Sequence, residues 1–228
     1  SYRDLPLRFA ETTTIYRDEK PGELLGLSRV RSITQDDAHV FCTPETLEQE
    51  IAGVFEIIKA FYTAFGFELE LHLSVRDPED LDKYLGDDLI WKQAEEQLAT
   101  SLDASGMEYV RDEGEAAFYG PKIDFIALDS LKRRWQLATI QLDFNMPKRF
   151  ELTYTAEDGS EQTPIMIHRA ISGSIERFMS IILEHYAGSL PLWLSPTQVS
   201  VLPISDEQTA YGDGVAAKLR EAVIRGEL

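Results

Sequence analysis

A set of polar side chains with the chemistry of an anion site lies near the start of the chain. Arg17 precedes a turn at Pro21-Gly22, and beyond the turn every second residue shares one face of a predicted strand. The residues on that face are Arg29, Arg31, Ile33, Gln35, Asp37 and His39. A guanidinium binds phosphate through a planar pair of donors. We therefore expect a strand, a loop and a second strand that hold an anionic ligand; an exposed edge strand with unrelated polar residues is the alternative.

Two histidines offer metal-ligand chemistry. His39 ends the polar row and His168 lies much later in the chain, while zinc in a catalytic site usually has three protein ligands. Asp37 could complete a 2-His-1-carboxylate set of the kind that binds iron in oxygenases. Cys42 follows His39 by an odd number of residues, which places it on the opposite face of a strand. Spacing alone leaves unrelated histidines as the simpler interpretation.

Any nucleotide must be held by side chains, because the chain has neither the Gly-x-x-x-x-Gly-Lys-Ser/Thr loop nor the Rossmann glycine fingerprint. The segment from His168 to Arg177 could contribute. Gly173 and its small neighbours allow a ligand to approach the backbone, and Arg177 opens a predicted helix. Two basic runs, at 132–134 and 148–149, are candidate contacts for RNA phosphates, or simply solvated turns.

The elements around these residues predict an antiparallel sheet with helices packed on it. Apolar residues at helical spacing predict helices over 44–65, 88–104 and 175–186. Alternating or buried patterns predict strands over 67–75, 122–128 and 135–144. After a proline-bracketed linker at 191–196, the chain predicts a buried strand at Val199–Ile204 and a helix at Glu207–Ile224.

Composition limits the classes of function. Of the 228 residues, 40 are Asp or Glu and 22 are Lys or Arg, a net charge of −18 that argues against a general nucleic-acid clamp. The acidic excess is concentrated between Glu45 and Glu115, with 19 acidic and 5 basic residues. One cysteine excludes a disulfide scaffold and fits a reducing compartment. No apolar run reaches the roughly 20 residues that a membrane span needs.

Several motifs in a fixed order closely resemble the catalytic core of threonyl-tRNA synthetases. They are SYRDLP at 1–6, YRDE at 16–19, TQDDAH at 34–39, GPKID at 120–124, and the segments Trp135–Asp143 and His168–Arg177. The resemblance covers residues 1 to about 195 and implies an α+β class II synthetase core, an antiparallel sheet that binds bent ATP. Residues 196–228 resemble the start of the anticodon-binding domain of the family.

The resemblance also implies roles for individual residues. Arg17, Gln35, Asp37 and Arg177 would form the catalytic set. The ATP-binding set would be Arg17, Glu19, Arg29, Ile33, Gln136, Thr139 and Arg177, with Glu19 on the adenine amino edge and Arg29 near the γ-phosphate. Threonine would be bound by Gln35, Asp37, Tyr119, Gln141 and Ser174. His39 and His168 match two zinc ligands, and Lys122 matches a further pocket position.

By the same resemblance, the protein would be a cytoplasmic threonine–tRNA ligase and a homodimer that uses ATP with Mg²⁺, Zn²⁺, L-threonine and tRNA(Thr). Zinc would reject valine, whose methyl group cannot coordinate, whereas a hydrophobic pocket separates such isosteres only about 100-fold. In the family, motif 1 and a third zinc ligand, a cysteine, lie upstream of the position of Ser1, and editing needs a separate domain. Ile33 stands where an aromatic residue often stacks on adenine.

Two other functions are compatible with the sequence. A synthetase fragment or paralogue that binds ATP or RNA without activating an amino acid would explain the missing segments. A metal-dependent oxygenase or hydrolase built on Asp37, His39 and His168 would explain the histidines but not the arginines.

Overall fold

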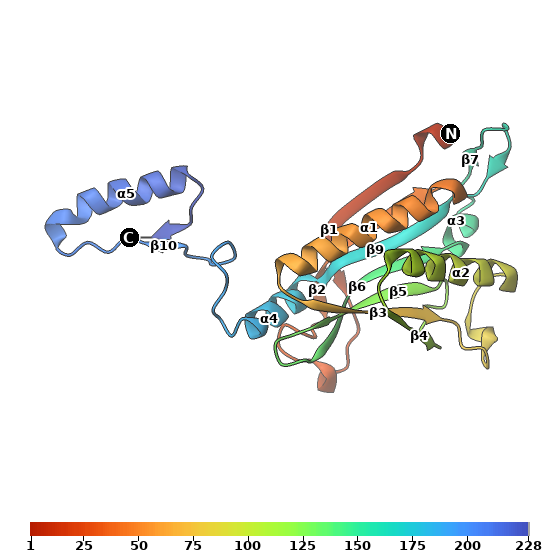
Figure 1. Ribbon diagram of the computed structural model, residues 1–228, viewed down its shortest axis with the longest axis horizontal. Helices are drawn as coiled ribbons and strands as arrows, with labels where there is room; N and C mark the ends of the chain where they lie inside the picture. The colour runs from red at the N-terminus through yellow and green to blue at the C-terminus, as the bar shows by residue number, and fades with distance from the viewer. Residues whose placement is uncertain (228) are drawn as a thin grey trace. The chain divides into compact units, whose positions relative to one another are not determined.

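A computed structural model describes residues 1–227, which form two compact units, residues 1–185 and residues from 186 onward (Figure 1). The boundary predicted at residue 195 therefore lies inside the second unit. None of the helices within the described residues has the length and apolar character needed to cross a membrane.

A seven-stranded sheet forms the centre of the first unit, with the strand order β1-β2-β9-β6-β5-β3-β4. Its strands are β1 (Leu7–Tyr16), β2 (Ser32–Cys42), β3 (Glu68–Val75), β4 (Tyr109–Glu113), β5 (Lys122–Leu128), β6 (Arg134–Asp143) and β9 (Ile165–Ser174). All neighbours are antiparallel except β3 and β4. The predicted α+β class, an antiparallel sheet flanked by helices, is confirmed.

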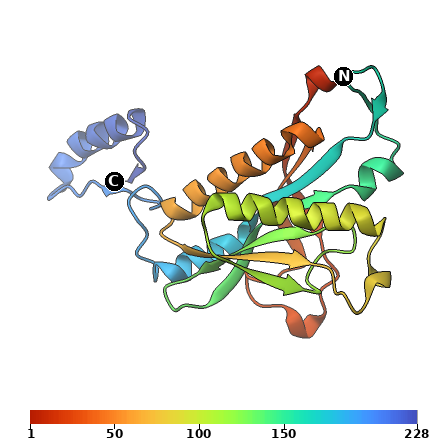
Figure 2. The ribbon, with the colours of Figure 1, turned by 45° about the vertical axis from the view of Figure 1, so that its right-hand side comes forward.

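Two long helices lie side by side across one face of this sheet (Figures 1 and 2). Helix α1 (Pro44–Ala64) begins where Thr43 and Thr46 form a capping box, with proline in the first turn. Helix α2 (Asp88–Ser105) begins where the side chain of Asp87 accepts a hydrogen bond from the backbone N–H of Leu89. Their apolar stripes form the core with buried strand residues, and the ring centroids of Phe55 on α1 and Phe125 on β5, for example, are 5.3 Å apart.

The first unit also contains one shorter helix, α4, a single-turn helix, α3, and a two-stranded ladder. Helix α4 (Ile175–His185) follows β9 directly, α3 (Asn145–Arg149) follows β6, and β7 (Tyr154–Thr155) pairs with β8 (Glu161–Gln162).

In the second unit, beyond residue 185, α5 (Thr209–Glu221) lies in the sequence between β10 (Val199–Ser200) and β11 (Gly226–Glu227), which pair in parallel. The buried strand predicted at Val199–Ile204 is wrong: two residues form it, both exposed, because so short a ladder has no sheet to bury it.

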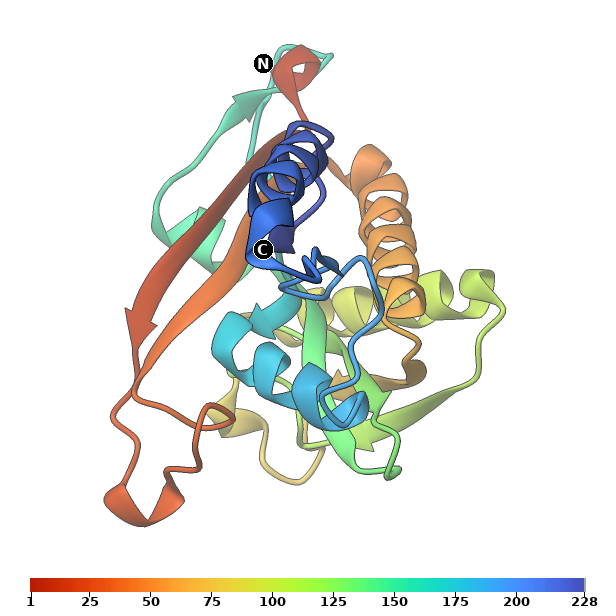
Figure 3. The same ribbon diagram turned by 90° about the vertical axis from the view of Figure 1, so that its left-hand side faces the viewer.

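The strand predicted beyond the Pro21-Gly22 turn, with Arg29 and Arg31 on its polar face, begins later in the structure than expected. Strand β2 begins at Ser32, and the arm before it contains a 3₁₀ turn at Pro21–Glu23 and a tight bridge between Leu25 and Arg29 (Figure 3). Side chains organise this arm in place of a ladder. Arg29 pairs with Glu19 at 2.9 Å, and Arg31 Nε donates to the backbone oxygen of Glu19.

Candidate functional site

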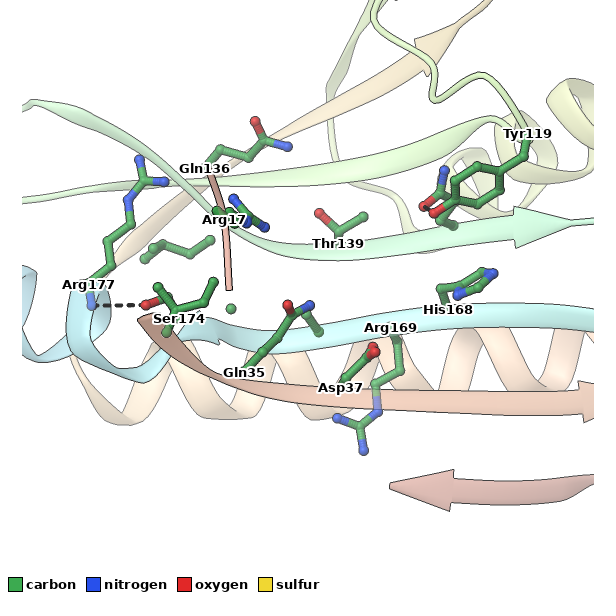
Figure 4. Close-up of a pocket in the computed structure, with 15 residues that line it drawn as sticks. Arg17, Gln35, Asp37, Tyr119, Gln136, Thr139, His168, Arg169, Ser174 and Arg177 are labelled. Carbon is green, nitrogen blue, oxygen red and sulfur yellow. Dashed lines mark hydrogen bonds between the residues drawn. The ribbon is translucent and has the colours of Figure 1, made fainter. Parts of the chain in front are cut away.

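A pocket of about 380 Å³ lies over the three adjacent strands β2, β9 and β6 and the start of α4. Eleven predicted site residues line it, namely Arg17, Ile33, Gln35, Asp37, Tyr119, Gln136, Thr139, Gln141, His168, Ser174 and Arg177. In Figure 4, Arg17, Gln136, Ser174 and Arg177 lie toward one end and Tyr119 and His168 toward the other. The pocket therefore has a cationic end and an imidazole–phenol end, which suits a ligand with different chemistry at its two ends.

The cationic end contains arginines without carboxylate partners. Within residues 1–227, neither Arg17 nor Arg177 forms an ion pair, and Nε of Arg177 is buried without a hydrogen-bond partner. Burial lowers the pKa of Arg177, and the nearby charges of Arg17 and Arg29 lower it further. Two converging guanidiniums without counter-ions make this end a site for an anion.

Glu19 and Arg29 lie beside this end in a second, smaller hollow of about 290 Å³, which shares Arg17, Ile33 and Arg177 with the main pocket. Arg29 bonds to Glu19 and to Glu23, so the pair is held together in the hairpin arm. Trp135 lines the same hollow, and the guanidinium of Arg177 lies 5.5 Å from its ring centroid.

An irregularity in β9 aims the residues at the junction with α4. Gln35 pairs with Ser174 but Asp37 pairs with Ala170, so three residues of β9 lie opposite Asp36 alone. Asp36 Oδ2 accepts hydrogen bonds from the backbone N–H groups of Ile171 and Ser172, at 2.9 and 3.0 Å. Gly173 has φ +71°, a conformation that favours glycine. The bulge brings Ser174 and Arg177 to the pocket.

The opposite end of the pocket contains His168, and His39 lies next to it outside the pocket lining. His39 and His168 are direct partners on β2 and β9, and the centroids of their rings are 4.7 Å apart. His168 Nε2 lies 2.9 Å from Oδ2 of the buried Asp143, and His39 Nε2 lies 3.9 Å from Oδ2 of Asp37. Burial and the neighbouring His168 lower the pKa of His39. Neutral imidazole is the form that binds a metal ion.

The donor set fits a metal ion only in part. A ligand histidine commonly gives its second ring nitrogen to a carboxylate, as His168 does to Asp143. Within residues 1–227, however, no group of three His, Cys, Asp or Glu side chains is arranged to hold an ion, so Asp37, His39 and His168 do not form the three-ligand set considered above. Cys42 is fully buried, and burial raises the pKa of its thiol to about 12.

Tyr119 and Gln141 form the wall beside His168. The Tyr119 hydroxyl donates to Gln141 Oε1 at 2.8 Å, and Gln141 Nε2 donates to the backbone oxygen of Gly120. Burial raises the pKa of Tyr119, and the carboxylates of Asp143 and Asp37 raise it further, so the phenol stays protonated. These bonds fix both side chains before any ligand binds.

The structure gives the basic run at 132–134, a candidate RNA contact in the sequence, other partners. Lys132 pairs with Glu68, Arg133 with Asp129 and Arg134 with Glu70, so these cations are engaged by carboxylates, which weakens the case for them as RNA contacts. Sequence reasoning missed the half-buried Asp36 and the buried Asp124 and Asp143, each of which accepts hydrogen bonds from another strand.

Comparison with known proteins identifies relatives of this arrangement. The family described as "tRNA synthetase class II core domain (G, H, P, S and T)" matches residues 1–186. The chain is 51% identical over 228 residues to threonine–tRNA ligase of Thermus thermophilus, and 51% identical over 229 residues to that of Deinococcus radiodurans. Both matches cover the whole chain but only 34% and 35% of the relative, so the chain spans about a third of their length.

A solved structure agrees with the sequence comparison. The crystal structure described as the RNA-binding domain of threonyl-tRNA synthetase from Cryptosporidium parvum Iowa II superimposes with a TM-score of 0.95 at 43% identity. It matches 100% of this chain and 56% of the other.

Proposed function

The chain belongs to the class II core domain family of tRNA synthetases, and we propose that the protein containing it is a threonine–tRNA ligase, which activates L-threonine with ATP and transfers it to tRNA(Thr). The observation that carries this proposal is a pair of arginines, Arg17 and Arg177, that have no ion-pair partner among residues 1–227 and lie at one end of a pocket whose other end holds His168. Activation joins a polyanion to an amino acid, so the two ends match its two substrates.

The chemistry needs charge neutralisation and alignment more than it needs a general base. An oxygen of the threonine carboxylate forms a bond to the α-phosphorus of ATP while the bond to the β-phosphate oxygen breaks, which yields threonyl-adenylate and pyrophosphate. Arg17 would bind the α-phosphate and the carboxylate, and Arg177 would bind ATP. In the second step a terminal ribose hydroxyl of the tRNA attacks the activated carbonyl carbon, gives up its proton and releases AMP.

The remaining residues would orient the substrates. Gln35 would place the carboxylate of threonine, and Asp37 would accept a hydrogen bond from its hydroxyl. Tyr119, Gln141 and Ser174 would form the rest of the threonine pocket. Arg29 would reach the γ-phosphate side and Glu19 the adenine amino edge. The ion pair between Glu19 and Arg29 supports a shared role, since it holds both on the ATP side of the pocket.

Zinc would be held by His39 and His168, with a third ligand from outside residues 1–227. The direct pairing of the two rings and the bond from His168 to Asp143 support this assignment. When bound, Zn²⁺ accepts an amine and a hydroxyl as ligands but not a methyl group, which would separate threonine from valine. Mg²⁺ would accompany ATP. By the resemblance to the family the protein would be a cytoplasmic homodimer, and the single cysteine fits a reducing compartment.

The proposal is tested by charging tRNA with the full-length protein that contains this chain. We expect threonyl-tRNA to form in the presence of ATP and L-threonine, with valine and proline charged at least about 100-fold more slowly. Preferential charging with another amino acid would refute the assignment to threonine. Tight ATP binding without any charging would favour the alternative, a non-catalytic paralogue.

A further inference from the structure

Asp124 is a buried carboxylate on β5 that lies behind the pocket wall. Its side chain is within reach of four donors from three strands, although the residue itself is only 4% exposed. Oδ2 accepts from the Ser74 hydroxyl at 2.7 Å and from the ammonium group of Lys122. Oδ1 accepts from Gln136 Nε2 at 2.7 Å and from the Thr139 hydroxyl at 3.0 Å. The pairing with Lys122 offsets the cost of burying the negative charge.

A bulge in β6 makes this arrangement possible. Phe125 on β5 pairs with Ala138 and Ile126 pairs with Gln136, so Leu137 is an extra residue on β6. Residues three apart on a regular strand point to opposite faces. Because of the extra residue, Gln136 and Thr139 instead bond to the same oxygen of Asp124. Both also line the pocket (Figure 4).

These bonds fix the polarity that the pocket wall presents. Gln136 turns its amide nitrogen toward Asp124, which leaves the carbonyl oxygen of the amide for a ligand. Thr139 gives its only hydroxyl proton to Asp124, which leaves the lone pairs of its oxygen. Asp124 thus makes two neighbouring side chains act as acceptors, although either could otherwise donate.

We propose that Asp124 is a positioning residue that sets Gln136 and Thr139 as acceptors for the two ribose hydroxyls of ATP; the inference rests on the proposed function. The phosphate groups of ATP only accept hydrogen bonds at neutral pH, so they do not match this wall. The ribose carries two adjacent hydroxyl donors, which match two adjacent acceptors. The adenine amino group is a single donor group and matches them less well.

The test measures ATP–pyrophosphate exchange by the full-length protein with ATP, 2′-deoxy-ATP and 3′-deoxy-ATP. In the parent protein, loss of either hydroxyl is expected to raise the KM for the nucleotide about 3- to 10-fold, the value of one hydrogen bond. In Asp124→Asn, the amide NH₂ turns toward Gln136 and Thr139, because the Lys122 ammonium holds the remaining oxygen. The KM for ATP then rises by a similar factor. The deoxy penalty, which is the KM for a deoxy analogue divided by the KM for ATP, falls below about 2-fold for each analogue. The KM for threonine stays unchanged.

Asp129→Asn is the matched control. Asp129 is also a buried carboxylate of the β5–β6 hairpin, but its donors are Leu131, Arg133 and Trp135, none of which lines the main pocket. Asp129→Asn is expected to have a lower free energy of unfolding but the same rise in KM for each deoxy analogue as the parent protein. Thr139→Val is a second variant that leaves Asp124 in place; it removes one acceptor and should abolish the penalty of one analogue only.

The outcomes separate the two claims. Absence of threonine-dependent exchange in the parent protein would refute the proposed function. Exchange with deoxy penalties that stay unchanged in Asp124→Asn and in Thr139→Val would overturn the role of Asp124 and leave the proposed function standing. A change in the KM for threonine, in place of that for ATP, would likewise overturn the ribose assignment. If Asp124→Asn does not fold, unchanged deoxy penalties in Thr139→Val alone would overturn the proposal, because an acceptor that Asp124 is proposed to set would then not bind the ribose.

Discussion

His39 and His168 lie directly opposite each other on β2 and β9, with their ring planes at 75° and the ring centroids 4.7 Å apart. The antiparallel register joins two residues that are remote in the sequence. On β6, the next strand, Asp143 bonds to the second of the two rings.

The pairing predicts how zinc content responds to mutation. We expect the full-length protein to purify with about one zinc ion per chain, and His168→Ala and His39→Ala each to lower this severalfold, because a site of three protein ligands loses one. Metal analysis of dialysed protein measures the ratio. His72→Asn is the control, since His72 bonds to Asp112 and Arg134 instead. Equal zinc content in all three variants would contradict the assignment.

Arg177→Ala should separate activity from stability. The guanidinium is half-buried, and no carboxylate of the described part of the chain pairs with it. Its removal should therefore change the free energy of unfolding by less than about 1 kcal/mol, the value of its contact with Trp135. Loss of an electrostatic contact to ATP should reduce pyrophosphate exchange about 100- to 1000-fold.

Arg133→Ala is the comparison, because Arg133 lies 5.4 Å from the same indole ring but is ion-paired with the buried Asp129. Its loss should cost about 1–3 kcal/mol of stability and leave exchange intact. Denaturant unfolding and the exchange rate measure both quantities. A reversed pattern, with Arg177→Ala unstable but active, would show that Arg177 is a structural residue.

Gly173→Ala should disturb the β9 bulge. At φ +71° an alanine costs about 1–2 kcal/mol, and its Cβ would lie 2.8 Å from the backbone oxygen of Leu137. The backbone strain and the close contact together should lower the free energy of unfolding by about 3 kcal/mol. Gly159→Ala is matched, because Gly159 has φ +83° but no atom within 4 Å of an added Cβ; it should cost only about 1–2 kcal/mol. Equal losses in the two variants would contradict tight packing at Gly173.

Acid should weaken the fold through Asp129. Burial favours the neutral acid, but hydrogen bonds from Trp135 and Arg133 outweigh it and lower the pKa of Asp129 from 3.8 to about 2. The unfolded chain then binds more protons than the native one between pH 4 and 2, so this contribution is complete above about pH 4 and is lost as the pH falls toward 2. The free energy of unfolding of Asp129→Asn should fall less steeply than that of the parent over this window. If the free energies of unfolding of the parent and of Asp129→Asn fell equally steeply over this window, Asp129 would not be the source of the acid sensitivity.

The sequence predicted elements whose signals are local. Thr43-Pro44 marked the start of α1, and the alternation over 33–37 placed Ile33, Gln35 and Asp37 on the pocket face of β2, as observed. The resemblance to a family gathered residues from β2, β6 and β9 that no local pattern could join. The extension of that strand back to Arg29 and Arg31 was wrong, because ion pairs such as Arg29–Glu19 organise the arm before Ser32.

Bulges and buried carboxylates could not be read from the pattern. A period of two assumes an uninterrupted ladder, and the extra residues of β9 and β6 break it at the two places that shape the pocket. Asp124 and Asp143 resemble ordinary strand residues in the sequence. Their importance comes from donors on other strands, which only the tertiary structure brings within reach.

Threonine-dependent ATP–pyrophosphate exchange by the full-length protein separates amino-acid activation from transfer to tRNA, so it is the decisive measurement for the proposed ligase. We expect rapid exchange with L-threonine, at least about 100-fold slower exchange with valine, and near-complete loss in Arg17→Ala. Exchange that prefers another amino acid, or that persists undiminished in Arg17→Ala, would contradict the proposed function.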